Sequence, residues 1–406
     1  MPRIFYGNFD FEHELAATSY NRSKQLERLN AELSTHLLAF ADDGDRLFYG
    51  GDGLADFLTD AATAGFPDVQ AVELLSQPTP DAELVPWGWS GAAISFGASL
   101  GWGYDSPDPG VVASVNSRTF SFEAEQRLDS AIPGAVEIDS IETLEVAIKK
   151  AADIWNCSGE EFDWLLKAEF GMSGRERVSG GGAQLEDSQA GWIRRRLNSG
   201  DRLYFEPRVE PLCELSSQWL VPKSDSGGGL STEPDLIGTT QLLVDRAGQY
   251  LGSILVNQSG TDLPSIADSE FSLSRESLNQ ILCDARSVAK ATQQSGYHGP
   301  IGIDSMVYRG LDGQPAARPI QDVNARLTMG RIALEWFRRF AKTDRPAWLL
   351  VPDAWLIERG IAAALDNPAV RLTSPRVVAG QTVGRVGVLI DDQDDWRKLL
   401  TADLRP

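Results

Sequence analysis

The chain has 406 residues, which is enough for two or three domains with a substantial hydrophobic core. It carries 58 acidic and 37 basic side chains and a formal net charge of −21, which argues against nucleic-acid binding by phosphate neutralisation and against docking on an anionic membrane. Its three histidines and three cysteines are scattered, without the spacing of a zinc or iron–sulfur site, so a metal site would need oxygen ligands.

The N-terminus lacks a charged segment followed by an apolar segment, and no run approaches the length of a membrane span. Sparse cysteines fit a reducing compartment. We therefore expect a cytoplasmic protein with no membrane partner and no nucleic-acid partner. The sequence leaves the oligomeric state open, with a homo-oligomer among the options.

Residues 1–110 have the pattern of an α/β domain. Residues 2–7 predict a first strand, and a long helical pattern follows as far as Leu38. Short apolar runs between Asp/Gly-rich turns then continue the alternation. Residues 86–103 are rich in glycine and tryptophan, which indicates loops around a ligand or at a domain junction, or alternatively a packing surface of small residues.

The pattern changes at residue 111. Residues 111–128 predict a strand running into a helix, with Asn116 or Ser117 as the helix cap. The elements expected beyond this point are a strand at 135–138, a helix at 141–155, a strand at 162–170, a basic helix at 191–197, two strands within 202–221, a hairpin around 247–248, a helix at 274–295, two strands at 299–309 and 317–326, and a helix from about 327 to 339.

Lys167 is the first candidate site residue. It lies late in a predicted strand, just before a glycine-rich turn that contains Gly171, Ser173, Gly174 and Arg175. Backbone N–H groups of such a turn can contact phosphate oxygens, and the lysine and arginine add positive charge. An ordinary hairpin loop is the alternative interpretation.

Glu206 begins the second candidate segment, EPRV (206–209), at the end of a strand. The backbone of this segment, including Val209, could contact the edge of an adenine, and Glu206 could accept a hydrogen bond from the adenine amino group. Glu210 or Glu214 could then bind ribose hydroxyls. Acidic residues of an ordinary surface are the alternative.

A third group consists of oxygen-bearing side chains on two apolar strands. Asp304 lies on one strand, and Asp322 and Asn324 lie two residues apart on the next, so the last two point to one face. Two carboxylates and an amide oxygen suit a hard cation such as Mg²⁺. A salt bridge, for example to Arg326, is the alternative, since carboxylates among apolar residues need a partner.

The order of these elements resembles the ATP-grasp superfamily over residues 111–340. The resemblance implies an N-terminal α/β domain (1–110), an ATP-grasp core of two α+β lobes with the nucleotide between them (111–340), and a C-terminal extension of unknown role (341–406). It implies roles in ATP binding for Lys167 with its glycine-rich turn, for the linker 206–209 and for Glu214 or Glu210. Arg118 stands where the family often has a phosphate-binding lysine.

The same resemblance implies Asp304, Asp322 and Asn324 as ligands of Mg²⁺, with Mn²⁺ as an alternative. Asp322 stands where the family usually has glutamate, which shortens this ligand by one methylene. Arg326 would steady an acylphosphate, together with Lys167, or else form a salt bridge to Asp304 or Asp322.

The implied function is an ATP-dependent ligase that joins a small-molecule carboxylate to an amine through an acylphosphate. Two alternatives remain at this point. One is a catalytically inactive MgATP-binding regulator or scaffold, and the other is a phosphotransferase with ATP-grasp geometry. The identities of the carboxylate and the amine are not encoded in any motif of the sequence.

Overall fold

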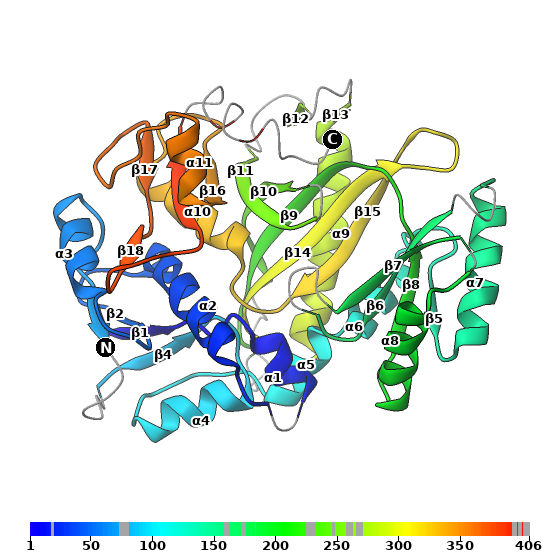
Figure 1. Ribbon diagram of the computed structural model, residues 1–406, viewed down its shortest axis with the longest axis horizontal. Coiled ribbons are helices and arrows are strands. Elements are labelled where there is room, and N and C mark those ends of the chain that lie inside the picture. Colours follow the sequence, from blue (N-terminus) through cyan, green and yellow to red (C-terminus); the bar gives the residue numbers. More distant parts are fainter. Residues whose placement is uncertain are drawn as a thin grey trace.

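A computed structural model of the chain describes residues 1–17, 20–72, 81–157, 162–171, 176–182, 184–224, 233–245, 248–256, 263–264 and 271–391, together with Trp396 and Leu400. Three large sheets organise this structure. Figure 1 shows an N-terminal sheet and a smaller sheet at opposite ends, with an eight-stranded sheet between them.

The N-terminal sheet has the order β3-β2-β1-β4 and all its pairings are parallel, as expected for an α/β unit. The predicted first strand is confirmed, but the helical pattern that follows it is divided into two α-helices and a 3-10 helix. The elements are β1 (Arg3–Tyr6), α1 (Phe11–Ala16), α2 (Lys24–Ser34), η1 (Thr35–Phe40), β2 (Arg46–Phe48), α3 (Ala55–Thr63), β3 (Gln70–Val72), β4 (Glu83–Pro86) and α4 (Gly91–Ser99). Helix α4 occupies the Gly/Trp-rich segment, where loops were expected.

The strand expected from residue 111 is wrong, because this segment forms helix α5 (Pro109–Val115). Its valines favour a strand, but Asp108 caps the helix by accepting from the N–H groups of Gly110 and Val111, and Pro109 occupies the first turn. Ser117 is confirmed as the cap of α6 (Arg118–Arg127), since its hydroxyl accepts from the N–H of Phe120 at 3.1 Å.

The smaller sheet has the order β5-β8-β6-β7 and is antiparallel. Its own hydrophobic core includes Trp164, Leu166, Ile193 and Phe205. The predicted strands and helices are confirmed as β5 (Val136–Ile138), α7 (Ile141–Ile154), β6 (Asp163–Ala168), α8 (Asp187–Asn198) and β8 (Leu203–Pro207). Strand β7 (Arg177–Gly181) was not predicted and lies in the glycine-rich stretch.

The eight-stranded sheet has the order β15-β14-β9-β10-β11-β16-β20-β17 and is antiparallel throughout. The predicted strands, the hairpin and both helices from residue 211 to 340 are confirmed. The elements are β9 (Pro211–Val221), β10 (Asp235–Val244), β11 (Tyr250–Leu255), α9 (Arg275–Gln294), β14 (Gly299–Arg309), β15 (Pro315–Asn324), α10 (Met329–Phe340), β16 (Ala347–Val351), α11 (Asp353–Glu358), β17 (Val370–Leu372) and β20 (Val386–Ile390), with the short strands β12 (Leu263–Pro264), β13 (Ser272–Leu273), β18 (Val377–Val378) and β19 (Gln381–Thr382).

One hydrophobic cluster joins the N-terminal part to the large sheet. It contains Phe5 and Leu37 as well as Trp219, Trp336 and Trp348. The smaller sheet is packed around a separate core. A small apolar cluster with Ile132, Met306 and Tyr308 lies between it and the large sheet.

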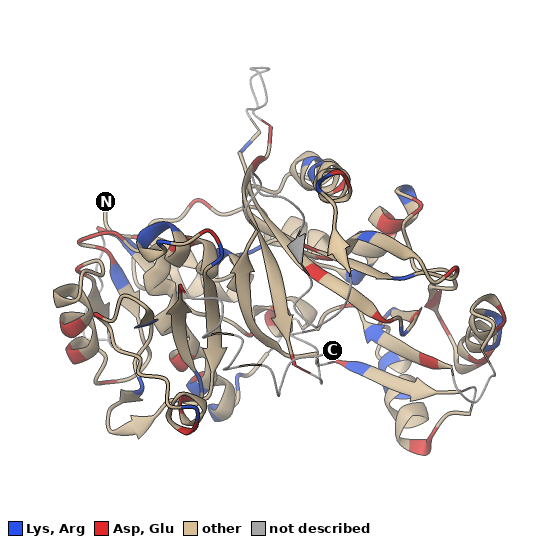
Figure 2. Ribbon diagram, turned by 90° about the horizontal axis from the view of Figure 1, so that it is seen from above, with Lys and Arg blue, Asp and Glu red and all other residues tan. Residues whose placement is uncertain are grey.

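Acidic and basic side chains are distributed over all parts of the fold (Figure 2). Within the described residues, we find no helix with the length and apolar character needed to cross a bilayer.

Candidate active site

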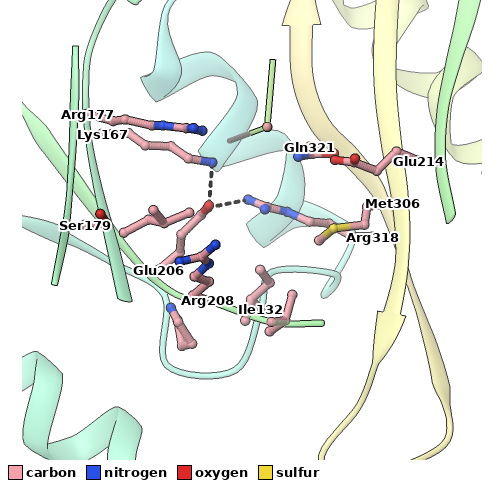
Figure 3. A pocket seen from close by; sticks show the side chains of 14 residues that line it. Ile132, Lys167, Arg177, Ser179, Glu206, Arg208, Glu214, Met306, Arg318 and Gln321 are labelled. Atoms are coloured by element: carbon pink, nitrogen blue, oxygen red, sulfur yellow. Dashed lines mark hydrogen bonds and ion pairs between the residues drawn. The ribbon is translucent and has the colours of Figure 1, made fainter. Parts of the chain in front are cut away.

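A cavity of about 350 Å³ lies where the smaller sheet faces strands β14 and β15. Its volume falls in the range of small-molecule sites. Side chains from β6 and β8 line one side and side chains from β14 and β15 the other (Figure 3). Leu165, Val209 and Met306 supply apolar surface.

The charged lining of this cavity is predominantly basic, although the protein as a whole carries a charge of −21. Four basic side chains face two acidic ones, Glu206 and Glu214. The basic residues are Lys167, Arg177, Arg208 and Arg318. A locally positive concave surface favours an anionic ligand.

Lys167 and Arg318 approach the carboxylate of Glu206 from two directions (Figure 3). Lys167 Nζ forms an ion pair with Oε1, and Arg318 Nη2 lies 3.0 Å from Oε2. Arg318 also donates to Glu125 of α6, with Nη2 at 3.1 Å from Oε2. The four residues therefore form a charge-balanced network that links β6, β8, β15 and α6.

The pKa values in this network follow from its pairing. Burial alone would raise the pKa of Glu206, but the adjacent Arg318 and Lys167 hold it well below its usual range. Burial lowers the pKa of Lys167, and the Glu206 carboxylate partly opposes this shift. Glu206 was expected to meet an adenine amino group, but in the structure both of its oxygens already contact basic side chains.

Asp304, Asp322 and Asn324 come together on the hairpin of β14 and β15. Asp304 lies directly opposite Asp322 in the register of the two strands, and Asn324 lies opposite Gly302. Asp304 Oδ1 accepts from the Ser216 hydroxyl at 2.6 Å, and Oδ2 accepts from Asn324 Nδ2 at 3.1 Å. Burial and the nearby Asp322 carboxylate raise the pKa of Asp304 to about 7.

This donor set fits a hard cation. The hydrogen-bond partners of Asp304 are both neutral, so its charge is balanced less well than that of Glu206. Two facing carboxylates and an amide are the ligand types that Mg²⁺ accepts. Within the described residues, no group of three or more His, Cys, Asp or Glu side chains could hold a metal ion, so Asn324 and ligand oxygens would have to complete such a site.

Arg118 connects the carboxylate pair with the cavity. Its Nη1 lies 3.3 Å from Asp322 Oδ1 and 3.5 Å from the carbonyl oxygen of Gln321, a residue that lines the cavity. Arg118 therefore links Asp322 to a residue of the cavity lining.

Arg326 forms a salt bridge, but its partner is neither Asp304 nor Asp322. Its Nη2 lies 2.7 Å from Oε1 of Glu12, and the same nitrogen donates to Asn324 Oδ1 at 2.9 Å. The alternative interpretation, a salt bridge of Arg326 to Asp304 or Asp322, is not what the structure shows, because helix α1 brings a third carboxylate to this place.

The remaining predicted residues are placed as follows. Glu214 lines the cavity, whereas Glu210 is exposed and pairs with Arg309 at 2.8 Å. Gly171 lies just after β6. Ser173, Gly174 and Arg175 lie outside the described residues.

Three functional candidates were missed from the sequence: Arg318, Glu125 and Glu12. The one local signal is the position of Arg318 in a predicted strand, two residues before Ile320; that it is buried, and so needs a carboxylate partner, is seen only in the structure. Glu125 and Glu12 carry no such signal, because helical acidic residues are ordinary on surfaces and only the tertiary fold buries these two.

No protein-family model and no curated protein sequence matches this chain. Solved structures are similar to it. One is PurK, an N5-carboxyaminoimidazole ribonucleotide synthetase in complex with ADP, with a TM-score of 0.50 and 11% identity over 91% of this chain and 93% of that one. Another is the pyruvate carboxylase of Rhizobium etli, with a TM-score of 0.55 and 14% identity over 97% of this chain and 36% of that longer one. Both similarities concern the fold, and the architecture predicted from the sequence is confirmed: the chain has the ATP-grasp fold.

Proposed function

We propose that this protein is an ATP- and Mg²⁺-dependent ligase that joins a small-molecule carboxylate to an amine. The observation that carries the proposal is the basic cavity between the smaller sheet and β14/β15, together with the carboxylate pair Asp304 and Asp322 on the same two strands. The fold shared with an ADP-bound synthetase supports the same reaction class. We also propose the division into residues 1–110, 111–340 and 341–406.

In this proposal the cavity holds ATP. Leu165, Val209 and Met306 enclose the base, and Lys167 and Arg177 face the phosphates. Arg118 borders the phosphate end through its contact with Asp322. Glu206 and Val209 are proposed to contact the adenine, and Glu214 the ribose. The proposed glycine-rich turn contains Gly171, Ser173, Gly174 and Arg175.

Asp304, Asp322 and Asn324 would hold Mg²⁺, or Mn²⁺, which when bound neutralises charge on the phosphate oxygens. Lys167 would have to exchange its contact with Glu206 for one with phosphate. Such positioning and charge stabilisation account for most of phosphoryl-transfer catalysis.

The reaction has two balanced steps. A carboxylate oxygen of the substrate attacks the γ-phosphorus, the bond to ADP breaks, and an acylphosphate forms. The amine nitrogen then attacks the acyl carbon, the C–O bond to phosphate breaks, inorganic phosphate leaves and the amine loses a proton. Arg326 lies beside Asn324 and would steady the negative charge of the acylphosphate.

ADP release from MgATP, measured with a panel of free amino acids that supply both carboxylate and amine, tests the proposal. We expect substrate-stimulated release by the wild type and at least a tenfold loss in Lys167→Ala and in Asp322→Ala, of the order found when single charge-stabilising donors are removed. Lys290→Ala and Asp105→Ala are matched controls on the surface. Unchanged turnover in Lys167→Ala and Asp322→Ala would refute these roles.

A second candidate is a MgATP-binding protein without ligase turnover. It is favoured by two contacts within the chain that occupy proposed ligand-binding groups. Glu206 contacts Lys167, and Asn324 Oδ1 accepts a hydrogen bond from Arg326. Tight MgADP binding without turnover would support this candidate. A phosphorylated substrate in place of free phosphate would instead identify a phosphotransferase.

A further inference from the structure

Helix α1 of the N-terminal part contacts Arg326, which follows strand β15 of the large sheet. It follows β1, at the carboxyl edge of the parallel sheet, where open α/β folds place their ligands. The N–H of Leu327 donates to the carbonyl oxygen of Trp87 at 3.0 Å, which joins the end of β15 to the same edge.

Arg326 is held by this N-terminal edge on several sides. Its Nε donates to Glu12 Oε1 at 2.8 Å, and its Nη2 lies 2.7 Å from the same oxygen. The rings of Trp87 and Phe11 lie 5.3 and 5.8 Å from its guanidinium carbon. Such contacts fix both the direction and the plane of the guanidinium group.

The orientation of Arg326 passes on to the carboxylate pair. Its Nη2 donates to Asn324 Oδ1, which leaves the amide nitrogen of Asn324 to donate to Asp304. The side chain of Glu12 thus lies at the start of a continuous series of contacts that ends at Asp304.

The surroundings of the Glu12 side chain are unfavourable for the stability of the fold. The residue is 8% exposed, and its Oε2 is buried without a hydrogen-bond partner. Leaving a buried polar atom unpaired destabilises the folded state. A carboxylate with a purely structural role would be expected to have both oxygens paired.

We propose that Glu12 is a positioning residue, which orients Arg326, and through it Asn324, for the ligase reaction. The inference rests on the proposed function. It makes the N-terminal part a component of the active site, because the arginine beside the reacting groups is oriented by a side chain 314 residues away in the sequence.

The test is a double-mutant cycle in the full chain, with ADP release stimulated by free amino acids as the assay. We expect Glu12→Gln to lower kcat at least tenfold, with the KM for ATP and the Kd for MgADP within twofold of the wild type. In an Arg326→Ala background, Glu12→Gln should have no further effect, since residues that act through one another are not additive.

Asp45→Asn is the matched control, because Asp45 is a buried carboxylate of the same N-terminal sheet and pairs with Arg3. It should leave kcat unchanged in both backgrounds. Glu12→Asp keeps the charge but withdraws it by one methylene and should lower kcat to an intermediate value.

Four results would overturn the inference. A folded Glu12→Gln protein with wild-type kcat would do so, and a full additional loss in the Arg326→Ala background would show that Glu12 acts elsewhere. If Glu12→Gln does not fold, wild-type kcat in Glu12→Asp has the same consequence. Absence of ADP release by the wild type overturns the proposed function itself, and this inference with it.

Discussion

Two carboxylates of the candidate site have opposite pKa shifts. Glu206 has a lowered pKa because Lys167 and Arg318 contact it, whereas Asp304 has a pKa raised to about 7 because it is buried and faces Asp322. The first carboxylate belongs to a network that is complete within the chain. The second has neutral hydrogen-bond partners and lacks comparable balance. The difference favours the Asp304 region for the proposed cation site.

Breaking the balanced network should have the largest effect on stability. Arg318→Met leaves Glu125 and Glu206 buried with Lys167 as the remaining close cation, and we expect a loss of about 3–5 kcal/mol in the free energy of unfolding. Urea unfolding measures it. The double variant Arg318→Met/Glu125→Gln should recover part of the loss, because it removes one uncompensated charge. Equal losses in the single and double variants would contradict the balance argument.

Neutralising each carboxylate in turn should change stability with opposite signs. Glu206→Gln should lower the free energy of unfolding by about 1–3 kcal/mol, since two buried cations lose their counter-charge. Asp304→Asn should preserve or raise it, because the amide removes repulsion with Asp322 while keeping its neighbours. The shift of Tm on adding MgADP should shrink in Asp304→Asn. A large destabilisation by Asp304→Asn would contradict this distinction, because it would show that the carboxylate of Asp304 stabilises the fold as that of Glu206 does.

His36 is a simpler case than either carboxylate, because burial alone lowers its pKa, to about 3. The unfolded chain takes up a proton below about pH 6.5 and the folded chain does not, so stability contributed by neutral His36 is present above this pH and is lost as the pH falls towards 3. The loss is about 1.4 kcal/mol per pH unit. His36→Phe should flatten the dependence of the unfolding free energy on pH between 6 and 4. An unchanged slope would show that other groups cause the pH dependence of the unfolding free energy.

The smallest effects should separate Glu214 from Glu210. Glu214 lines the cavity, and Glu214→Gln should weaken MgADP binding roughly tenfold, equivalent to about 1.4 kcal/mol. Glu210 pairs with Arg309 on the surface, and Glu210→Gln should change binding less than twofold and stability by less than about 1 kcal/mol. Calorimetric titration with MgADP compares them. Equal effects of the two substitutions on MgADP binding would contradict a separate role for Glu214.

Much of the fold was accessible from sequence because its signals are local. Strands β14 and β15 are apolar runs joined by a turn, and their pairing places Asp304 opposite Asp322. The strand expected at residue 111 was wrong because two valines weigh less than the cap of Asp108 and the proline that follows it. Capping is as local as propensity, so this error was avoidable.

The sequence by itself determined the kinds of groups available: oxygen ligands on paired strands, a lysine at the end of β6, and arginines in place of histidine or cysteine chemistry. Only the tertiary structure decided how they pair. Arg326 pairs with Glu12, and Lys167 pairs with Glu206, which also pairs with Arg318. Periodicity along a chain determines which face a side chain occupies, whereas the partner of a charge depends on which distant element packs against that face.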